Sequence, residues 1–293
     1  MYRRTFLQAT AALAAHAASG SGSSLPIKRA VEFSMLPGDL PIADRMKLAR
    51  DSGFEQVECP TTPDQKNAEE MKRAALRAGL RIHSVMNMDH WKYPLSSSDP
   101  AVVQRSLKGA RTSIQNAHFW EADTVLLVPG VVDANNSYAD VYVRSRESIR
   151  QLLPLAEESK IILAIEEVWN KFLLSPLEFA TYVDSFKSPW LRAYFDVGNV
   201  VLYGYPQDWI RTLGKRIVKL HIKDFSFRED PVSKNRVAAW VPLLEGDIQW
   251  RAVHQALRDI GYEGTATVEL PGGDASYLRD VNQRFEKILS GQV

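Results

Sequence analysis

Four apolar runs in the second half of the chain end in side chains that can bind metal ions. The first ends in Glu166 and Glu167, and the next three carry Asp196, His221 and Glu269. Carboxylate oxygens and one imidazole nitrogen suit a divalent ion with an open coordination position. Each residue alone has an ordinary structural explanation, such as a histidine satisfied in the core. Their recurrence at four consecutive runs favours a metal site, because crowded carboxylates without a cation would repel one another.

The alternation of side chains along these runs bears on which carboxylate is the ligand. Successive side chains of a strand point to opposite faces, so residues two apart share a face. Glu166 shares a face with Ala164, whereas Glu167 points the other way. This parity predicts Glu166 as the ligand and keeps Glu167 as the alternative. The runs that carry His221 and Glu269 follow the same alternation.

The runs belong to a regular alternation of strands and helices. Eight strands are predicted, at residues 31–36, 55–59, 80–86, 124–128, 161–166, 193–197, 217–222 and 265–270. Amphipathic stretches such as residues 42–52 and 68–78 lie between them. This pattern predicts a single closed (β/α)8 TIM barrel over residues 28–293. A doubly wound sheet is disfavoured, because no glycine-rich turn follows the first strand.

A barrel of this kind carries its active site at the carboxyl ends of its strands. The ends of strands five to eight are where the candidate ligands lie, so the fold would bring them together around one axis. Asp196 joins the set if Tyr194 faces the barrel interior.

Composition excludes several classes of partner and site. Lys and Arg number 36 against 35 Asp and Glu, so no long-range field attracts nucleic acid or an anionic membrane. A small-molecule ligand is expected instead. The single cysteine, Cys59, excludes a disulfide framework and a Cys-based zinc cage. Any metal must therefore be held by His and carboxylates, with Mn²⁺ expected first and Mg²⁺, Co²⁺ or Zn²⁺ as alternatives.

The first two dozen residues differ from the rest. Arg3 and Arg4 precede an alanine-rich stretch and a Gly/Ser run that ends at Ser24. Paired arginines, a weakly apolar segment and small residues are typical of a twin-arginine (Tat) export signal and linker over residues 1–24. We therefore expect export, to the periplasm or beyond, with no membrane anchor once the signal is removed. An amphipathic N-terminal helix is the alternative.

Several segments together resemble a known family. LAIEEVWNKFLLSP, YFDVGN, KLHIKD, PLLEGDIQW and the final VEL resemble the xylose isomerase-like TIM barrel superfamily, in its sugar phosphate isomerase/epimerase branch. That branch includes D-tagatose 3-epimerase and L-ribulose-5-phosphate 3-epimerase. The resemblance implies one divalent ion bound by Glu166, Asp196, His221 and Glu269. It also implies that the two glutamates act as acid and base on a keto sugar, and that the chain forms a homodimer or homotetramer.

The expected reaction moves a proton next to a carbonyl through an enediolate. Return of the proton to the same carbon gives epimerisation, and return to the neighbouring carbon gives aldose-ketose isomerisation. The same groups serve both, so the choice stays open. A metal-dependent dehydratase of the inosose or dehydroshikimate type and a non-catalytic sugar-binding barrel are the alternatives.

Seven further residues are expected near the substrate. Candidates for its hydroxyl groups, for a lid after strand three and for a stacking wall are His83, Asn199, Lys223, Arg228, His90, Trp91 and Trp169. The turn at Gly272 and Gly273 precedes the last helix, where many barrels bind phosphate. A free sugar is nevertheless favoured, because no cluster of arginines accompanies the glycines and phosphorylated sugars are cytoplasmic.

Overall fold

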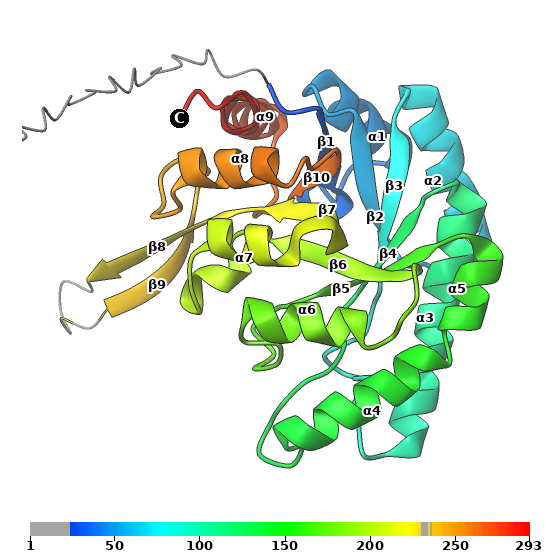
Figure 1. Ribbon diagram of the computed structural model, residues 1–293. Helices are drawn as coiled ribbons and strands as arrows, with labels where there is room; N and C mark the ends of the chain where they lie inside the picture. Colours follow the sequence, from blue (N-terminus) through cyan, green and yellow to red (C-terminus); the bar gives the residue numbers. More distant parts are fainter. Residues whose placement is uncertain (1–23, 230–233, 235) are drawn as a thin grey trace, which may run out of the picture.

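The computed structural model of this chain describes residues 24–229, 234 and 236–293, and it forms a closed barrel of eight parallel strands (Figure 1). Around the barrel the strands follow the order β1, β10, β7, β6, β5, β4, β3, β2. Their bounds are β1 (Ile27–Glu32), β2 (Gln56–Pro60), β3 (Arg81–Met86), β4 (Thr124–Leu127), β5 (Ile162–Glu166), β6 (Leu191–Asp196), β7 (Ile217–Ile222) and β10 (Gly264–Val268). The predicted TIM barrel is confirmed. The predicted export signal lies outside the described residues.

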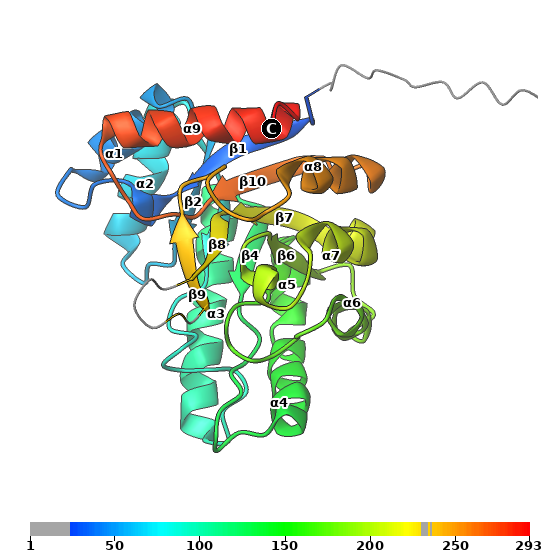
Figure 2. The ribbon, with the colours of Figure 1, turned by 90° about the vertical axis from the view of Figure 1, so that its left-hand side faces the viewer.

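Helices surround the barrel (Figures 1 and 2). They are α1 (Ile42–Asp51), α2 (Gln65–Ala78), α3 (Pro100–Trp120), α4 (Tyr138–Arg150), α5 (Leu153–Ser159), α6 (Pro176–Asp184), α7 (Pro206–Leu213), α8 (Trp250–Asp259) and α9 (Ala275–Ser290). Side chains such as Asp64, Asp99 and Ser175 cap their first turns, which satisfies backbone N–H groups that have no partner in the helix. Within the described ranges, no helix is long and apolar enough to cross a membrane.

The inward face of the barrel follows the predicted parity. Ala164 and Tyr194 are buried and pack in the interior with Leu126 and Val128. Residues of opposite parity, such as Leu163, belong to the larger core between strands and helices. Tyr194 therefore faces inward, the condition on which Asp196 joins the other ligands.

The first strand ends earlier than predicted. The sequence pattern extended it over residues 31–36, but β1 ends at Glu32 and a 3-10 helix, η1 (Phe33–Met35), follows. The N–H of Leu36 donates to the carbonyl oxygen of Phe33, and the guanidinium of Arg45 lies 3.7 Å from the Phe33 ring centre. A helical turn buries Phe33 and Met35 as well as a strand would. Glu32 consequently stands at the carboxyl end of the barrel.

An antiparallel hairpin between β7 and α8 was not predicted. It consists of β8 (Asp224–Glu229) and β9 (Arg236–Val241), and it projects from the barrel (Figures 1 and 2). The buried carboxylate of Asp224 anchors its base by accepting hydrogen bonds from the Leu244 N–H at 2.8 Å and from Trp250 Nε1 at 2.9 Å. The hairpin is thereby fixed beside the carboxyl end of β7.

Candidate active site and metal centre

Four side chains converge at the carboxyl end of the barrel. Each of Glu166, Asp196, His221 and Glu269 offers one ligating atom, and the four atoms lie within 4.8 Å of one another. Glu166 and Asp196 end their strands, and the backbone N–H of Glu269 donates to the carbonyl oxygen of Ile222. Strand register therefore brings together residues that are far apart in the sequence.

His221 Nδ1 faces the three carboxylates. It lies 2.9 Å from Glu166 Oε1, 3.1 Å from Glu269 Oε2 and 3.9 Å from Asp196 Oδ2. A nitrogen surrounded by hard oxygens is a donor set that a divalent ion accepts. Glu167 is not in this group, so the geometry favours Glu166, as parity predicted.

Lys223 reaches two of the same carboxylates. Its Nζ lies 2.7 Å from Asp196 Oδ2 and 2.6 Å from Glu269 Oε2. One ammonium group is therefore shared between two buried carboxylate oxygens. Glu58 and Glu166 in turn lie on the two ring nitrogens of His221, so four carboxylates share the charges of Lys223 and His221. Such a surplus of buried negative charge is costly unless a further cation binds. The residues present therefore fit a divalent metal ion.

The turn after β6 orients Asp196. Its Oδ1 accepts hydrogen bonds from the N–H groups of Gly198 at 2.7 Å and Asn199 at 3.0 Å, which leaves Oδ2 for the site. A Cβ at Gly198 would lie 2.5 Å from Lys223 Cγ. Glycine is thus required there for Lys223 to reach the carboxylates.

Glu58 is a site residue that the sequence did not assign. Its Oε2 lies 2.7 Å from His221 Nε2 and accepts a hydrogen bond from the Tyr194 hydroxyl, while Oε1 accepts one from Ser84. All four side chains are fully buried. An Nε2–H that donates to a carboxylate leaves Nδ1 as the ligand, and such partners orient metal-binding histidines. The signal in the sequence was a carboxylate at the end of the second strand.

The surroundings shift the pKa values of the ligands in the metal-free chain. Burial alone would lower the pKa of His221, but neighbouring acidic groups, Tyr194, Glu269 and Glu166 among them, raise it well above its usual value. Burial raises the pKa of Glu166 to about 7. Burial would also raise the pKa of Glu269, but His221 and Lys223 outweigh it and hold that pKa below its usual range. Metal binding must therefore displace a proton from this group of side chains.

Glu167 is buried and does not belong to the group of converging ligands. It is 2% exposed, and neither carboxyl oxygen has a hydrogen-bond partner among the described residues. Burial, followed by the charges of Asp196 and Glu166, raises its pKa to about 10.

Asn199 and Trp169 contribute to the frame of the site. Asn199 Nδ2 donates to the carbonyl oxygen of Glu167 at 3.0 Å. Trp169 Nε1 donates to the carbonyl oxygen of Asn199 at 3.2 Å, and its ring stacks on Trp240 with 5.0 Å between ring centres. One face of the Trp169 ring is therefore covered by Trp240.

The remaining candidates are spread more widely. His83 is fully buried inside the barrel, with Nε2 3.0 Å from Thr267 Oγ1, so it is closed off from solvent. His90 and the exposed Trp91 lie together on the loop after β3. Arg228 is exposed on β8. The structure brings Lys223, Asn199 and Trp169 to the site more directly than these four residues.

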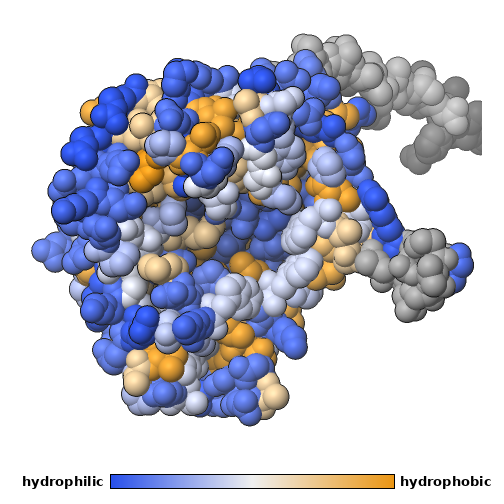
Figure 3. Space-filling model, turned by 180° about the vertical axis from the view of Figure 1, so that it is seen from behind, coloured by the Kyte–Doolittle hydropathy of each residue, from blue (hydrophilic) through white to orange (hydrophobic). Residues whose placement is uncertain are grey.

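A cavity of about 260 Å³ opens beside the ligands. Its lining residues are Glu32, Lys223, Trp240, Glu269, Leu270 and Pro271. Seen from behind, the molecule is hollowed near its centre, with hydrophilic residues in the hollow and the hairpin projecting beside it (Figure 3).

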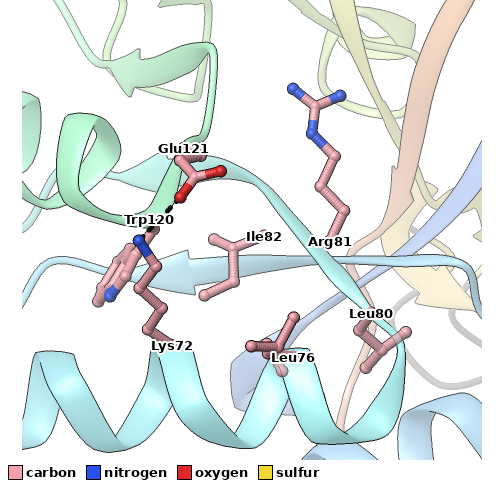
Figure 4. Close-up of a pocket in the computed structure, with 8 residues that line it drawn as sticks. Lys72, Leu76, Leu80, Arg81, Ile82, Trp120 and Glu121 are labelled. Atoms are coloured by element: carbon pink, nitrogen blue, oxygen red, sulfur yellow. Dashed lines mark hydrogen bonds and ion pairs between the residues drawn. The ribbon is translucent and has the colours of Figure 1, made fainter.

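A second cavity, of about 300 Å³, lies by α2 and β3, where Lys72 reaches Glu121 at 2.9 Å (Figure 4). Arg81, the first residue of β3, lines it. This cavity is therefore at the amino end of the barrel, away from the candidate ligands.

Comparisons with known proteins identify the family of this chain. The model of the xylose isomerase-like TIM barrel family matches residues 46–287. L-ribulose-5-phosphate 3-epimerase of Escherichia coli O1:K1 is 26% identical over 263 residues, which cover 83% of this chain and 90% of that protein.

Solved structures show the same fold. A D-tagatose 3-epimerase-like protein superposes with a TM-score of 0.75 at 19% identity, covering 91% of this chain and 99% of its own. A xylose isomerase-like protein from Mycobacterium smegmatis in complex with magnesium has a TM-score of 0.68 at 20% identity, covering 91% and 97%. Because the family model spans most of the barrel, this chain belongs to the xylose isomerase-like TIM barrel family.

Proposed function

We propose that this protein is a divalent-metal-dependent sugar isomerase or epimerase that acts on a free ketose or a small carbohydrate derivative. The observation that carries the proposal is the convergence of Glu166, Asp196, His221 and Glu269 within 4.8 Å at the carboxyl end of the barrel. The related L-ribulose-5-phosphate 3-epimerase supports the reaction class, since it is a sugar epimerase and therefore an isomerase.

The four converging side chains would hold one ion, with Mn²⁺ first and Mg²⁺, Co²⁺ or Zn²⁺ as alternatives. When bound, such an ion polarises the substrate carbonyl and stabilises the negative charge of the enediolate. His221, oriented by Glu58, would supply the nitrogen ligand.

Two glutamates would move the proton. The side chain of Glu269 is 29% exposed and lines the cavity, so it is the group placed to take a proton from the carbon next to the carbonyl. Lys223 keeps that carboxylate ionised, as a base requires. Glu166 would return a proton from the other side of the substrate. Return to the same carbon inverts it, and return to the neighbouring carbon isomerises the sugar.

The turn between β10 and α9 supports an unphosphorylated substrate, because a protein side chain already caps the N-terminus of α9. The carboxylate of Asp274 accepts hydrogen bonds from the N–H groups of Ser276 and Tyr277, both at 2.9 Å, so it occupies the first turn of α9. A Cβ at Gly272 would lie 2.8 Å from the carbonyl oxygen of Met35. This glycine allows close packing against η1, and the helix N-terminus is already satisfied without a phosphate.

Export by the twin-arginine route is part of the same proposal. Its support is the sequence around Arg3 and Arg4. An exported enzyme would meet free sugars, in agreement with the substrate class. Assembly into a homodimer or homotetramer also stays a proposal.

The test is solvent exchange with a metal-defined protein. The metal-stripped chain is loaded with Mn²⁺ and incubated with a panel of ketoses in D₂O, and deuterium at the carbon next to the carbonyl is followed by NMR. Deuterium incorporation with an epimeric or isomeric product supports the proposal. Loss of water from the substrate would indicate the dehydratase alternative. Binding without exchange would indicate a sugar-binding barrel, and absence of bound metal would overturn the enzyme proposal.

A further inference from the structure

The geometry points to Glu32 as the residue that selects the neutral, polyhydroxylated end of the substrate against a phosphorylated one. Its carboxyl group would pair with a substrate hydroxyl in the cavity between Glu32 and Trp240. This inference rests on the proposed function, because it concerns the end of a sugar that lies away from the metal ligands.

Strand geometry places Glu32 in the cavity. It is the last residue of β1 and pairs in register with Glu58, whose side chain points into the barrel. Glu32 lines the cavity together with Glu269 and Lys223. Its Oε1 accepts one hydrogen bond from Ser34 Oγ, at 2.7 Å. A carboxylate has about four acceptor positions, so capacity remains for hydroxyl groups of a ligand.

The charges around the cavity disfavour an anion. Among the described residues that line the cavity, Lys223 is the one with a positively charged side chain. Its Nζ lies 2.7 Å from Asp196 Oδ2 and 2.6 Å from Glu269 Oε2. Burial, followed by the charge of Glu269, raises the pKa of Glu32 to about 7, so this carboxyl group is ionised at pH 8.5. With Glu269 held by the metal ion, a phosphate here would still meet the carboxylate of Glu32. A hydroxyl group brings no charge and can donate a hydrogen bond to Glu32.

Trp240 gives the cavity an apolar wall. Its ring stacks on Trp169 at an interplanar angle of 16°, and Lys223 Nζ lies 4.9 Å from its centre. The C–H face of a sugar packs well on an aromatic ring, which contributes contact area at little entropic cost. The stacking wall predicted at Trp169 is therefore assigned to Trp240, the tryptophan that lines the cavity.

The experiment compares a neutral ketose with its phosphate. Affinities of D-fructose and D-fructose 6-phosphate for the Mn²⁺-loaded full chain are measured by calorimetry at pH 8.5 in wild type, Glu32→Gln and Glu121→Gln. Glutamine keeps the shape of Glu32 and removes its charge. Glu121→Gln makes the same change in the cavity at the amino end of the barrel. We expect wild type to favour D-fructose by about tenfold or more, since a like charge nearby commonly costs at least that factor.

In Glu32→Gln the preference should fall at least about fivefold, mainly through tighter binding of the phosphate, whereas Glu121→Gln should keep the wild-type ratio. Trp240→Ala should weaken both sugars by a similar factor. An unchanged ratio in Glu32→Gln would overturn the inference, and so would the absence of binding by either sugar.

Failure of this inference is distinguishable from failure of the proposed function. If ketoses exchange deuterium but Glu32→Gln leaves the ratio of the D-fructose and D-fructose 6-phosphate affinities unchanged, the isomerase proposal stands and the role of Glu32 is wrong. If that affinity ratio changes in Glu32→Gln but no ketose exchanges deuterium, the role of Glu32 stands and the isomerase proposal is wrong.

Discussion

Charged side chains meet at both ends of the barrel, but the two ends balance their charges differently. At the amino end, Lys219 Nζ lies 2.8 Å from Asp123 Oδ1, and Arg81 donates to the other oxygen of the same carboxylate at 2.7 Å. At the carboxyl end, Lys223 and His221 are shared among the four carboxylates of Glu58, Glu166, Asp196 and Glu269. Paired charges hold the amino end together. The imbalance at the carboxyl end is what a bound cation would remove, and it marks the site.

The largest effect is expected from Glu269→Gln at the carboxyl end. Removal of the proposed base should lower deuterium exchange by a factor of about 10²–10⁴, the usual contribution of general acid-base catalysis. The far-ultraviolet circular dichroism spectrum should be unchanged. Glu121→Gln, at the amino end, is the matched control. Exchange at the wild-type rate in Glu269→Gln would refute its role.

Glu58→Gln should weaken metal binding by about 10–100-fold, as loss of such a partner of a metal-binding histidine usually does. Glutamine preserves shape and a carbonyl acceptor but removes the charge that orients His221. Titration of the metal-stripped protein with Mn²⁺ measures the change. An unaltered affinity would mean that the Glu58–His221 pair serves only the fold.

Asp123→Asn should break the balance at the amino end. It would leave Lys219, whose side chain is 6% exposed, without its carboxylate. Asp123 is itself 42% exposed, so we expect a loss of about 1–3 kcal/mol in the free energy of unfolding, below that of a fully buried pair. Urea denaturation measures the loss. Mn²⁺ affinity should stay at the wild-type value, and a parallel fall in affinity would show that the two ends are coupled.

The smallest effect is expected from Glu121→Gln. Glu121 is 80% exposed at its side chain, and it meets Lys72 in an ion pair at the surface. Solvent screens such pairs. The melting temperature and the exchange rate should both match wild type, and a clear change in either would disqualify this variant as a control.

The sequence predicted the inward-facing residues of the barrel correctly, because the alternation of side chains along a strand allows one arrangement only. Side chains alternate between the two faces of a strand, so Ala164 and Glu166 must share one face of β5. That face points into the barrel, and the sequence alone was enough to place Glu166 there. Predictions failed where the partner is distant or the pattern is ambiguous. Glu58 pairs with a histidine 163 positions away, which no local spacing encodes. The run from Val31 to Leu36 reads as a strand, yet a helical turn buries the same apolar residues.

The hairpin was missed for a related reason. The sequence between β8 and β9, DPVSKN, contains no Asn-Gly or Asp-Gly turn, so no short-range signal indicated a hairpin. Trp240 could be assigned to the cavity only once the hairpin was seen to fold back beside Lys223.

The most direct test of the central claim is calorimetric titration of the metal-stripped chain with Mn²⁺, in wild type and His221→Ala. We predict one ion per chain in wild type, abolished or strongly weakened in His221→Ala, and retained in Glu121→Gln. Absence of Mn²⁺ binding in wild type, with Mg²⁺, Co²⁺ and Zn²⁺ also failing to bind, would contradict the account. Unchanged affinity in His221→Ala would contradict it equally, because the ion would then be held elsewhere.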